Sequence, residues 1–374
     1  MAGAPSAGMR AALDAAAAIR GLTSPNPWVG CAIVSEGRPI ATGATEPPPG
    51  RHAERAALEA AGDAARGSTL FCTLEPCTPF EGKRTPPCSD AIVEAGVSRV
   101  VVALEDPDLR VAGEGLARLR AAGIEVTVGD GREEAIGQLR PYIKHRETGL
   151  PYVVAKFAAT LDGRSATANG DSQWITGALA RSRVHDERAR VDAILAGSGT
   201  VIADDPALTA RPGGARAERQ PLRVVADARG RVPPIARLFG EPGRVLVATT
   251  LNSDAGWRAE IAAAGAEVVV LEPAETGINL SQLLQALGLR EILNVWIEGG
   301  PTLLGSAFDE DVVDEVWAFV APKLIGGRGL PAVGGVGAAT MAAATTLREP
   351  AVEVLGGDVL VRGYTGGWRQ MTGR

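Results

Sequence analysis

Between residues 52 and 88 the chain reads His52-Ala53-Glu54, then Thr73-Leu74-Glu75-Pro76-Cys77, then Thr85-Pro86-Pro87-Cys88. Three of these residues, His52, Cys77 and Cys88, offer one imidazole and two thiolates, which are ligand types that zinc prefers. A catalytic zinc takes three protein ligands, because its fourth tetrahedral position stays open for water. Glu54 lies two residues beyond the histidine, where it can meet that water without ligating the metal. The stretch therefore predicts a catalytic zinc site.

The order of these residues is that of the zinc-dependent nucleobase deaminases, H-x-E followed by P-C and a second cysteine, in which the glutamate carries protons. The spacing differs from that form, because residues 78–87 separate the two cysteines where two residues are usual. A longer loop can still return both sulfur atoms to one ion, since the entropy cost of closing a loop grows slowly with its length. The alternative is that Cys77 and Cys88 are buried core thiols and that His52 caps a helix.

Size and composition predict a globular protein with two domains. A chain of 374 residues exceeds one ordinary hydrophobic core, and 45% hydrophobic with 22% charged residues is typical of globular proteins. The net charge of −6 argues against a nucleic-acid partner, because such binders usually carry a basic excess. No stretch is apolar enough to cross a bilayer, so we expect no membrane partner and a cytoplasmic location. Four cysteines make no disulfide framework here, and Cys31 and Cys72 are expected to be buried in strands.

The first part of the chain alternates between helix and strand patterns. Helices are expected over residues 6–20, 52–61, 87–96 and 131–149, and strands over residues 28–35, 38–43, 68–73, 99–104 and 124–128. This order predicts an α/β layered sheet with His52 in the first turn of one helix and Cys88 at the start of another. The composition changes abruptly near residue 150, which predicts domains over residues 1–148 and 149–374. His145 lies among charged residues and is expected at the surface.

The second part also predicts an α/β domain. Strands are expected over residues 152–158, 193–197, 222–227, 244–249, 267–271, 292–298 and 313–320, with two more between 352 and 364 that suggest an antiparallel edge; helices are expected over residues 178–190, 255–264 and 281–288. No G-x-G-x-x-G follows the first strand, so this dinucleotide fingerprint is absent. Gly299-Gly300 closes a strand and opens a helix. This turn is either a packing turn or a phosphate site built from backbone amides.

Asn26 has two interpretations. It lies between two prolines just before the first expected strand, and asparagine often forms turns. Its side chain also offers a donor and an acceptor, which complement the edge of a pyrimidinone. In a deaminase, we favour substrate recognition by Asn26, with a turn as the alternative.

The first domain resembles the bifunctional riboflavin-biosynthesis deaminase/reductase family, RibD, in residues 25–30, 52–54, 73–77 and 84–88. In that family the first domain hydrolyses the 2-amino group of a diaminopyrimidinone ribosyl phosphate. The resemblance implies a cytidine-deaminase-like fold, with His52, Cys77 and Cys88 as zinc ligands, Glu54 as proton shuttle and Asn26 as a pyrimidine contact. Family members generally carry a histidine soon after the first cysteine and a shorter loop. This chain has neither, so its substrate contacts in this loop differ from the family pattern, although Lys83 or Arg84 can still hold a phosphate there.

The second domain resembles the reductase half of the same family in residues 156–163, 170–176, 204–211 and 298–301. The resemblance implies a dihydrofolate-reductase-like α/β fold and NADPH as the cofactor. The implied NADPH site consists of Ala158, Trp174, Thr200, Asp204, Gly300, Pro301, Thr302, Leu303, Leu304, Gly305 and Ser306. The implied site for the ribosyl phosphate consists of Ser172, Arg188, Leu208, Arg211 and Glu298.

The implied reduction opens the ribose at C1′ and adds hydride, which yields a ribityl chain. Arg188 and Arg211 can clamp the 5′-phosphate, because a guanidinium fork matches phosphate oxygens, or they can form surface ion pairs. Asp204 can assist ring opening or protonate the imine nitrogen, or it can belong to a turn. Lys156 is either a contact to phosphate or carbonyl or a charge at the end of a strand. His185 is expected to be structural.

The expected protein is therefore a zinc-dependent deaminase and NADPH-dependent reductase that acts on a small phosphorylated pyrimidine. One alternative is a nucleobase or nucleic-acid deaminase with an unrelated second domain, although an aromatic content of 4% disfavours a base-stacking surface. The other is a relative with one activity or none. Terminal strands in such a domain often pair across a two-fold axis, so we expect a homo-oligomer, either a dimer or a tetramer.

Overall fold

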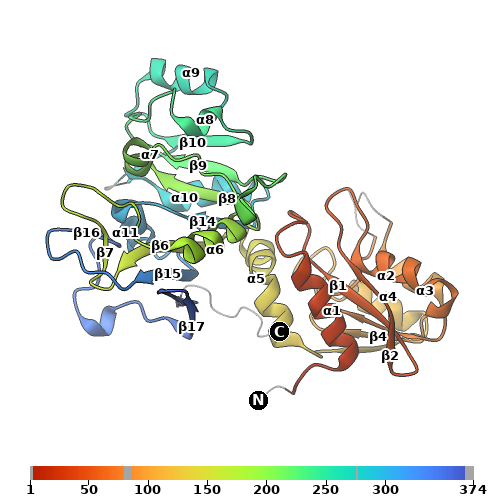
Figure 1. Cartoon of the computed structure of the whole chain (residues 1–374). Coiled ribbons are helices and arrows are strands. Elements are labelled where there is room, and N and C mark those ends of the chain that lie inside the picture. The colour runs from red at the N-terminus through yellow and green to blue at the C-terminus, as the bar shows by residue number, and fades with distance from the viewer. Residues whose placement is uncertain (1–2, 80–85, 275–276, 367–374) are drawn as a thin grey trace. The chain divides into compact units, whose positions relative to one another are not determined.

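The chain forms two compact units in the computed structural model, Met1–Gly149 and Leu150–Arg374 (Figure 1). The structure describes residues 3–79, 86–274 and 277–366. Each unit is built on a β-sheet with helices packed against it, which confirms the expected two-domain α/β fold class. Across these described ranges, every helix is too short or too polar to pass through a bilayer.

Unit 1 contains a five-stranded sheet in the order β2-β1-β3-β4-β5. Its elements are α1 (Ala7–Ala18), β1 (Gly30–Ser35), β2 (Arg38–Ala44), α2 (Ala53–Ala61), η1 (Gly62–Ala65), β3 (Thr69–Cys72), α3 (Cys88–Ala95), β4 (Arg99–Val102), α4 (Glu114–Ala121), β5 (Glu125–Val128) and α5 (Arg132–Thr148). Strand β1 is antiparallel to β2 and β3, while β3, β4 and β5 are parallel. The start of β1 and the ends of β2 and β3 therefore lie at one edge of the sheet.

Glycines in β1 and β2 let helices α1 and α2 lie close to the sheet. A Cβ on Gly30 would lie 1.9 Å from the carbonyl oxygen of Ala12, and a Cβ on Gly43 would lie 2.4 Å from that of Ala53. Any larger residue would push the helices away, because cores are packed without spare room. The start of α2 is therefore held beside the end of β2. His52 is the N-cap of α2, one position before the first turn in which it was expected.

The buried residues of unit 1 confirm one expectation and overturn another. Cys31 and Cys72 are fully buried free thiols in strands, as the sequence predicted. The pairing of β1 with β3 places them opposite each other. His145 was expected at the surface, but only 8% of it is exposed. The prediction was wrong because it rested on the charged neighbours in sequence. In α5, His145 lies three residues after Tyr142, so both belong to the buried face of the helix.

Unit 2 contains a nine-stranded sheet in the order β11-β10-β9-β8-β14-β6-β15-β18-β17. Its elements are β6 (Tyr152–Thr160), β7 (Arg164–Ala166), α6 (Ala178–Arg188), β8 (Ala193–Gly197), α7 (Ser198–Asp204), η2 (Pro212–Gly214), β9 (Leu222–Ala226), α8 (Arg237–Gly240), β10 (Val245–Thr249), α9 (Ala255–Ala263), β11 (Glu267–Val270), β12 (Pro273–Ala274), β13 (Gly277–Ile278), α10 (Leu280–Gly288), β14 (Asn294–Ile297), α11 (Pro301–Asp309), β15 (Glu315–Ala321), β16 (Leu330–Pro331), η3 (Met341–Ala343), β17 (Arg348–Leu355) and β18 (Asp358–Tyr364).

The sheet of unit 2 is parallel from β11 to β15, and β18 and β17 form the expected antiparallel edge. Helix α7 follows β8 directly, and α11 follows the neighbouring strand β14 after a short turn. Both helices therefore begin at the carboxyl edge of the sheet. Their first turns adjoin, since a Cβ on Gly300 would lie 3.5 Å from Oγ1 of Thr200. The sequence analysis did not anticipate α7.

The buried carboxylate of Glu75 fastens the loop after β3 to helix α4. It accepts hydrogen bonds from the N–H groups of Asp106 (3.1 Å), Gly113 (2.9 Å) and Leu116 (3.2 Å). Gly113 is the N-cap of α4, so this side chain from a distant segment caps the helix. A carboxylate is favoured at that position because the N-terminal end of a helix carries partial positive charge.

The same loop touches α4 through backbone atoms. A Cβ on Gly115 would lie 2.1 Å from the carbonyl oxygen of Pro76 and 3.0 Å from Oε1 of Glu75. A glycine is required at this position because the obstructing atom belongs to the backbone. The contact holds the residue that precedes Cys77 in place.

We expect Gly115→Ala to lower the free energy of unfolding of unit 1 by about 1–3 kcal/mol, because the added methyl group must displace the Pro76 carbonyl. The matched control is Gly137→Ala in α5, where a Cβ meets no atom within 4 Å. That variant should be neutral or more stable by up to about 1 kcal/mol. Native-state hydrogen exchange of unit 1 amides in the two full-length variants measures both effects, and equal stabilities would contradict the proposed contact.

Candidate metal centre and cofactor cleft

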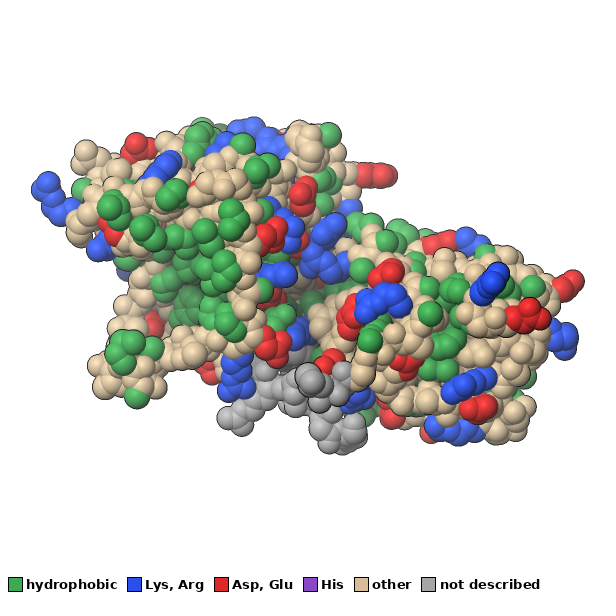
Figure 2. Space-filling view, turned by 60° about the horizontal axis from the view of Figure 1, so that its bottom comes forward, with side chains coloured by type: hydrophobic (Ala, Val, Ile, Leu, Met, Phe, Trp, Pro, Cys, Tyr) green, Lys and Arg blue, Asp and Glu red, His purple; other side chains and the backbone are tan. Residues whose placement is uncertain are grey.

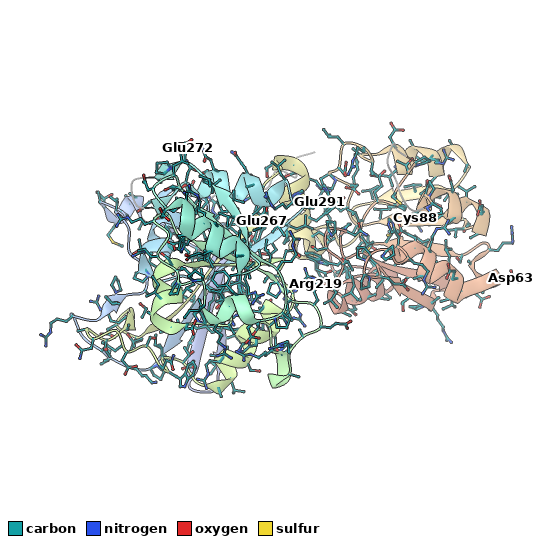
Figure 3. The ribbon with its side chains drawn as sticks, turned by 90° about the horizontal axis from the view of Figure 1, so that it is seen from above. Asp63, Cys88, Arg219, Glu267, Glu272 and Glu291 are labelled. Atoms are coloured by element: carbon teal, nitrogen blue, oxygen red, sulfur yellow. The ribbon has the colours of Figure 1, made fainter. Side chains whose placement is uncertain are left out.

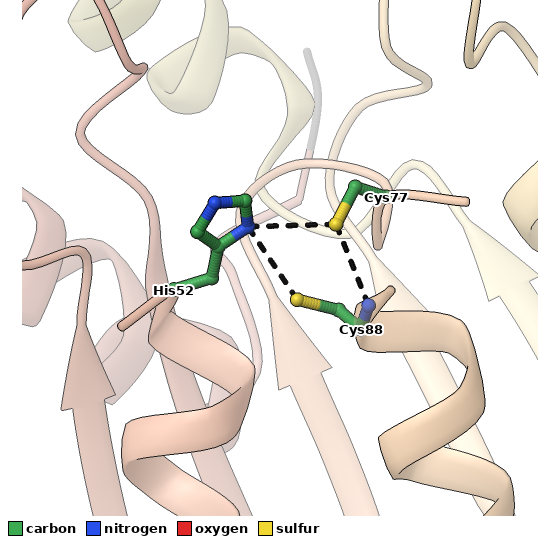
Figure 4. A group of neighbouring side chains, drawn as sticks. All are labelled: His52, Cys77 and Cys88. Atoms are coloured by element: carbon green, nitrogen blue, oxygen red, sulfur yellow. Dashed lines mark hydrogen bonds between the residues drawn. The ribbon is translucent and has the colours of Figure 1, made fainter. Parts of the chain in front are cut away.

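Three side chains from three separate segments meet in unit 1 (Figure 4). His52 caps α2, Cys77 lies in the loop after β3, and Cys88 is the first residue of α3. The His52 Nδ1 atom lies 3.4 Å from Sγ of Cys77 and 3.5 Å from Sγ of Cys88. The three ligand atoms all lie within 4.8 Å of one another. Figure 3 shows Cys88 in the interior of unit 1, whereas Asp63 lies at its surface.

These distances fit a tetrahedral zinc ion. Bonds of about 2.0–2.1 Å to nitrogen and 2.3 Å to sulfur, at the tetrahedral angle, place the nitrogen and sulfur atoms roughly 3.6 Å apart. The two measured N···S separations agree with that value. The N–H of Cys88 also donates to Sγ of Cys77 at 3.4 Å, and such a bond at a helix N-terminus favours the thiolate that a metal requires.

Glu54 lies beside this cluster in the first turn of α2 and is only 3% exposed. The pKa of its carboxyl is raised above the usual value, mainly by burial and to a smaller extent by the charge of the neighbouring Cys77. Its side chain also hydrogen-bonds with that of Cys88. A buried carboxyl whose pKa is raised above the usual value is suited to accept and release a proton.

The structure places Asn26 at the same edge of the sheet, before β1. Its N–H donates to the carbonyl oxygen of Thr23 (2.9 Å), and the Thr23 hydroxyl donates to the carbonyl oxygen of Asn26 (2.9 Å). Among the described residues, this turn is held by the backbone of Asn26 rather than by its side chain. Asn26 therefore belongs to a turn, but its side-chain amide takes no part in holding that turn. Lys83 and Arg84, which were expected to hold a phosphate, lie outside the described residues.

Unit 2 contains a cleft with a volume of about 1610 Å³ at the carboxyl edge of its parallel strands. This volume exceeds the roughly 300–1,000 Å³ of a pocket for one drug-sized ligand, so the cleft can hold a dinucleotide and a second molecule. Most of the residues that the sequence analysis singled out line it, namely Ala158, Ser172, Trp174, Arg188, Thr200, Asp204, Leu208, Arg211, Glu298, Gly300, Pro301, Thr302, Leu303 and Ser306.

Two residues of the expected cofactor site do not line the cleft. Leu304 is fully buried in the hydrophobic core, and a Cβ on Gly305 would lie 2.3 Å from backbone atoms of Gly334 and Gly335. Successive residues of a helix point in different directions, so one turn of α11 cannot present all of its side chains to a ligand. Leu304 and Gly305 instead pack α11 against the rest of unit 2.

Glu298 forms a buried ion cluster in the cleft with Arg188 and Lys156. Arg188 binds both carboxylate oxygens, at 2.7 and 2.8 Å, and Nζ of Lys156 lies 3.3 Å from Oε2. Burial by itself raises the pKa of Glu298, but the two cations outweigh it and lower the pKa to about 2. The remaining Nη1 of Arg188 donates to the carbonyl oxygen of Thr209 (3.2 Å). The guanidinium of Arg188 is therefore bonded to Glu298 and to the backbone. Arg211 also lines the cleft.

Asp204 and Asp205 have different positions at the end of α7. Asp205 adopts the left-handed conformation with φ of 38°, and its carboxylate accepts the N–H of Arg237 (2.7 Å), so it forms the turn. Asp204 is the last residue of α7; it is exposed to the cleft, which Asp205 also lines, and partial desolvation raises the pKa of the Asp204 carboxyl. This arrangement separates a turn residue from a side chain that is available for acid chemistry.

The cleft also contains residues that the sequence analysis did not single out. The Arg181 guanidinium lies 4.6 Å from the centre of the Trp174 ring. Lys323 does not line the cleft itself, but its Nζ donates to the Trp174 carbonyl oxygen (2.6 Å). Ser198 and Arg231 line the cleft and are hydrogen-bonded to each other. No motif indicated these residues, because they come from segments that are distant in the sequence.

Comparisons with known proteins cover both units. Residues 4–104 match the family described as cytidine and deoxycytidylate deaminase zinc-binding region, and residues 151–361 match the RibD C-terminal domain. Among solved structures, the RibD of Acinetobacter baumannii is 38% identical with a TM-score of 0.86, covering 96% of this chain and 98% of that one. A second solved structure is that of a diaminohydroxyphosphoribosylaminopyrimidine deaminase/5-amino-6-(5-phosphoribosylamino)uracil reductase from Thermotoga maritima. It is 33% identical with a TM-score of 0.83, and the match covers 96% of this chain and 98% of that one.

Curated relatives extend over nearly the same length. The riboflavin biosynthesis protein RibD of Escherichia coli is 42% identical over 86% of this chain and 89% of its own. The riboflavin biosynthesis protein RibD of Mycobacterium tuberculosis is 41% identical, and the match covers 94% of this chain and 95% of that protein. Similarity at this level across both units leads to one conclusion: the chain belongs to the RibD family, bifunctional deaminase/reductases of riboflavin biosynthesis that use zinc and NADPH.

Proposed function

We propose that residues 1–148 catalyse the deamination and that residues 149–374 catalyse the reduction. The observation that carries the first assignment is the meeting of His52, Cys77 and Cys88 at zinc-ligand distances beside the buried Glu54. The second assignment is supported by the cleft of unit 2, which is large enough for NADPH together with a substrate. The substrate is 2,5-diamino-6-ribosylamino-4(3H)-pyrimidinone 5′-phosphate, and the final product is 5-amino-6-(5-phospho-ribitylamino)uracil.

In unit 1, His52, Cys77 and Cys88 hold the zinc, and Glu54 moves the proton. When bound, zinc would activate a water molecule by lowering its pKa toward neutrality. Glu54 would accept a proton from the attacking water and pass it to the amino group at C2 of the pyrimidinone. The water oxygen becomes bonded to C2, the C2–N bond breaks, and the amine leaves as ammonia. Asn26 binds the pyrimidinone edge with its side-chain amide, and Arg84 contacts the phosphate.

In unit 2 the cofactor and the substrate share the cleft. NADPH would be held by residues that line the cleft, namely Ala158, Trp174, Thr200, Asp204, Gly300, Pro301, Thr302, Leu303 and Ser306. The first turns of α7 and α11 adjoin there and would offer backbone N–H groups to its pyrophosphate. Ser172, Leu208, Arg211 and Glu298 contact the ribosyl phosphate. Arg211 is the phosphate ligand, whereas Arg188 positions Glu298.

The reduction requires one hydride and one proton. When bound in the cleft, NADPH would supply the hydride for C1′ of the ring-opened imine, and Asp204 would supply the proton to the nitrogen. The position of Asp204 in the lining of the cleft supports this role, and the upward direction of its pKa shift is the one that proton donation requires. Lys156, held at 3.3 Å from Glu298, contributes positive charge near the reacting end of the substrate.

We further propose that the protein works in the cytoplasm as a homo-oligomer. Strand β17 is an edge strand of the large sheet, and its side chains Val352 and Val354 are 68% and 71% exposed. Figure 2 shows hydrophobic side chains gathered on the face of unit 2 that it turns to the viewer. Exposed apolar side chains on an edge strand favour association with a second copy.

Replacing Glu54 with glutamine should abolish ammonia release, with a loss of at least about 10²–10⁴-fold in rate, because the amide cannot carry a proton. Zinc content, measured by elemental analysis of the purified variant, should stay at one ion per chain. A variant that deaminates at nearly the normal rate would refute the assignment of Glu54.

For Asp204→Ala we expect NADPH oxidation to slow by about 10²-fold or more while deamination proceeds normally. Ammonia and NADPH are followed in the same reaction, starting from the diaminopyrimidinone substrate. The matched variant is Asp205→Asn, which alters the turn residue and should change the reduction much less. Equal loss of both activities in Asp204→Ala would contradict two separate sites.

The double variant Val352→Glu/Val354→Glu should dissociate the homo-oligomer, because paired charges on the edge strand oppose its burial. Light scattering during size-exclusion chromatography reports the mass of each species. Val270→Glu on β11, at the opposite edge of the sheet and 44% exposed, is the control and should leave the mass unchanged. A monomeric wild-type protein at micromolar concentration would contradict the proposal.

A further inference from the structure

Trp174 is an exposed indole in the lining of the unit 2 cleft, and two cations from distant segments hold it in place. The Arg181 guanidinium lies over its ring, 4.6 Å from the ring centre, and Nζ of Lys323 donates to its carbonyl oxygen (2.6 Å). Tryptophan side chains are usually well buried, yet 61% of Trp174 is exposed. A large aromatic ring that is both exposed and held in place is suited to contact a ligand.

A second contact fixes the Arg181 guanidinium over the indole. Its Nη1 donates to the carbonyl oxygen of Thr176 (2.6 Å), which lies between Trp174 and the start of α6. The short segment that carries the indole therefore also holds the guanidinium against one face of it. Among the described residues no carboxylate pairs with Arg181, so its positive charge is not neutralised at this place.

The cofactor changes its charge during the reduction. The nicotinamide ring of NADPH is neutral, and the loss of hydride leaves a ring that carries a positive charge. The face of an indole attracts cations, because its π-electrons make that face negative. A guanidinium on one face offsets this attraction. The opposite face then binds a positively charged ring less well, while its contact with a neutral ring is little changed.

The neighbours of Trp174 favour the nicotinamide end of the cofactor. Ser172, two residues before it, is a proposed substrate contact, and both residues line the cleft. Helix α6, which carries Arg181, ends at Arg188, whose guanidinium binds the substrate contact Glu298. Hydride passes where the cofactor and the substrate meet, so Trp174 lies on the side of the cofactor that faces the substrate.

We propose that Arg181 acts through the Trp174 indole to make the cleft bind NADPH in preference to NADP⁺. The reduced cofactor is retained for the reaction, and the oxidised cofactor leaves more readily once its ring is positively charged. Arg181 is a positioning residue in this account, because it acts through the ring on which it is stacked. This inference rests on the proposed cofactor site of unit 2 and adds the group that distinguishes the two oxidation states of the cofactor.

The test measures the dissociation constants of NADPH and NADP⁺ for the full-length protein by isothermal titration calorimetry. Arg181→Met keeps a long side chain without the charge, and it should lower the ratio of the NADP⁺ constant to the NADPH constant by roughly 2–5-fold. Arg181→Lys keeps the charge and should lower the ratio less. The matched control is Arg183→Met: Arg183 belongs to the same helix and lies 5.6 Å from the Trp317 ring, but it does not line the cleft. This control should leave the ratio unchanged.

A double-mutant cycle tests whether the indole carries the effect. In a chain with Trp174→Leu, which removes the ring, Arg181→Met should leave the ratio of the two constants unchanged. If the ratio falls there as much as it does in the chain that keeps Trp174, the guanidinium acts directly on the charge of the cofactor, and the proposed route through the indole is wrong.

The remaining outcomes separate the inference from the function on which it rests. If Arg181→Met weakens the binding of NADPH and NADP⁺ equally, or changes neither, Arg181 does not distinguish the two oxidation states. If the wild-type protein binds NADP⁺ as tightly as NADPH, the proposed preference does not exist. If the wild-type protein binds neither form, the cofactor site of unit 2 is itself refuted, and the role of Arg181 falls with it.

Discussion

Both candidate sites depend on helices that begin at the edge of a sheet where strands end. In unit 1, α2 and α3 bring His52 and Cys88 to the end of β3, where Cys77 follows. In unit 2, α7 and α11 begin beside each other after β8 and β14. Helix N-termini favour negatively charged groups, such as the thiolates that would hold a metal in unit 1 and the cofactor phosphates proposed for unit 2. Close packing of helix on sheet is therefore the constraint that the chemistry requires, and Gly30 and Gly43 permit it in unit 1.

Two buried carboxylates support these sites in different ways. Glu75 is surrounded by N–H donors, and burial raises its pKa despite those hydrogen bonds. Glu298 faces two cations, which lower its pKa to about 2 despite burial. A carboxyl with a lowered pKa in the folded state stabilises the fold above its unfolded pKa and loses that contribution as the pH falls toward 2. Glu298 therefore stays ionised at neutral pH and can hold Arg188 and Lys156 in the cleft.

The arginines of the cleft show why residue type alone does not assign a role. Arg188 and Arg211 were both expected either to clamp a phosphate or to form surface ion pairs. In the structure, the guanidinium of Arg188 donates hydrogen bonds to the Glu298 carboxylate and to the Thr209 carbonyl oxygen. Arg231, which no motif indicated, is oriented toward the cleft by Ser198. A buried ion pair and an exposed ligand site use the same side chain, and only the neighbouring groups distinguish them.

The sequence by itself determined the two-domain α/β class, the zinc-ligand set His52, Cys77 and Cys88, and the burial of Cys31 and Cys72. These follow from ligand chemistry and local hydrophobic patterns, which a linear chain displays directly. Only the tertiary structure decided that His145 is buried, that Leu304 and Gly305 pack in the core, and that Glu75 caps α4. The physical reason is that a side chain's surroundings depend on how its helix is oriented about its own axis and on which distant segments pack beside it. These two factors decide whether the side chain contacts the protein core or a ligand. Neither quantity is written in the spacing of neighbouring residues.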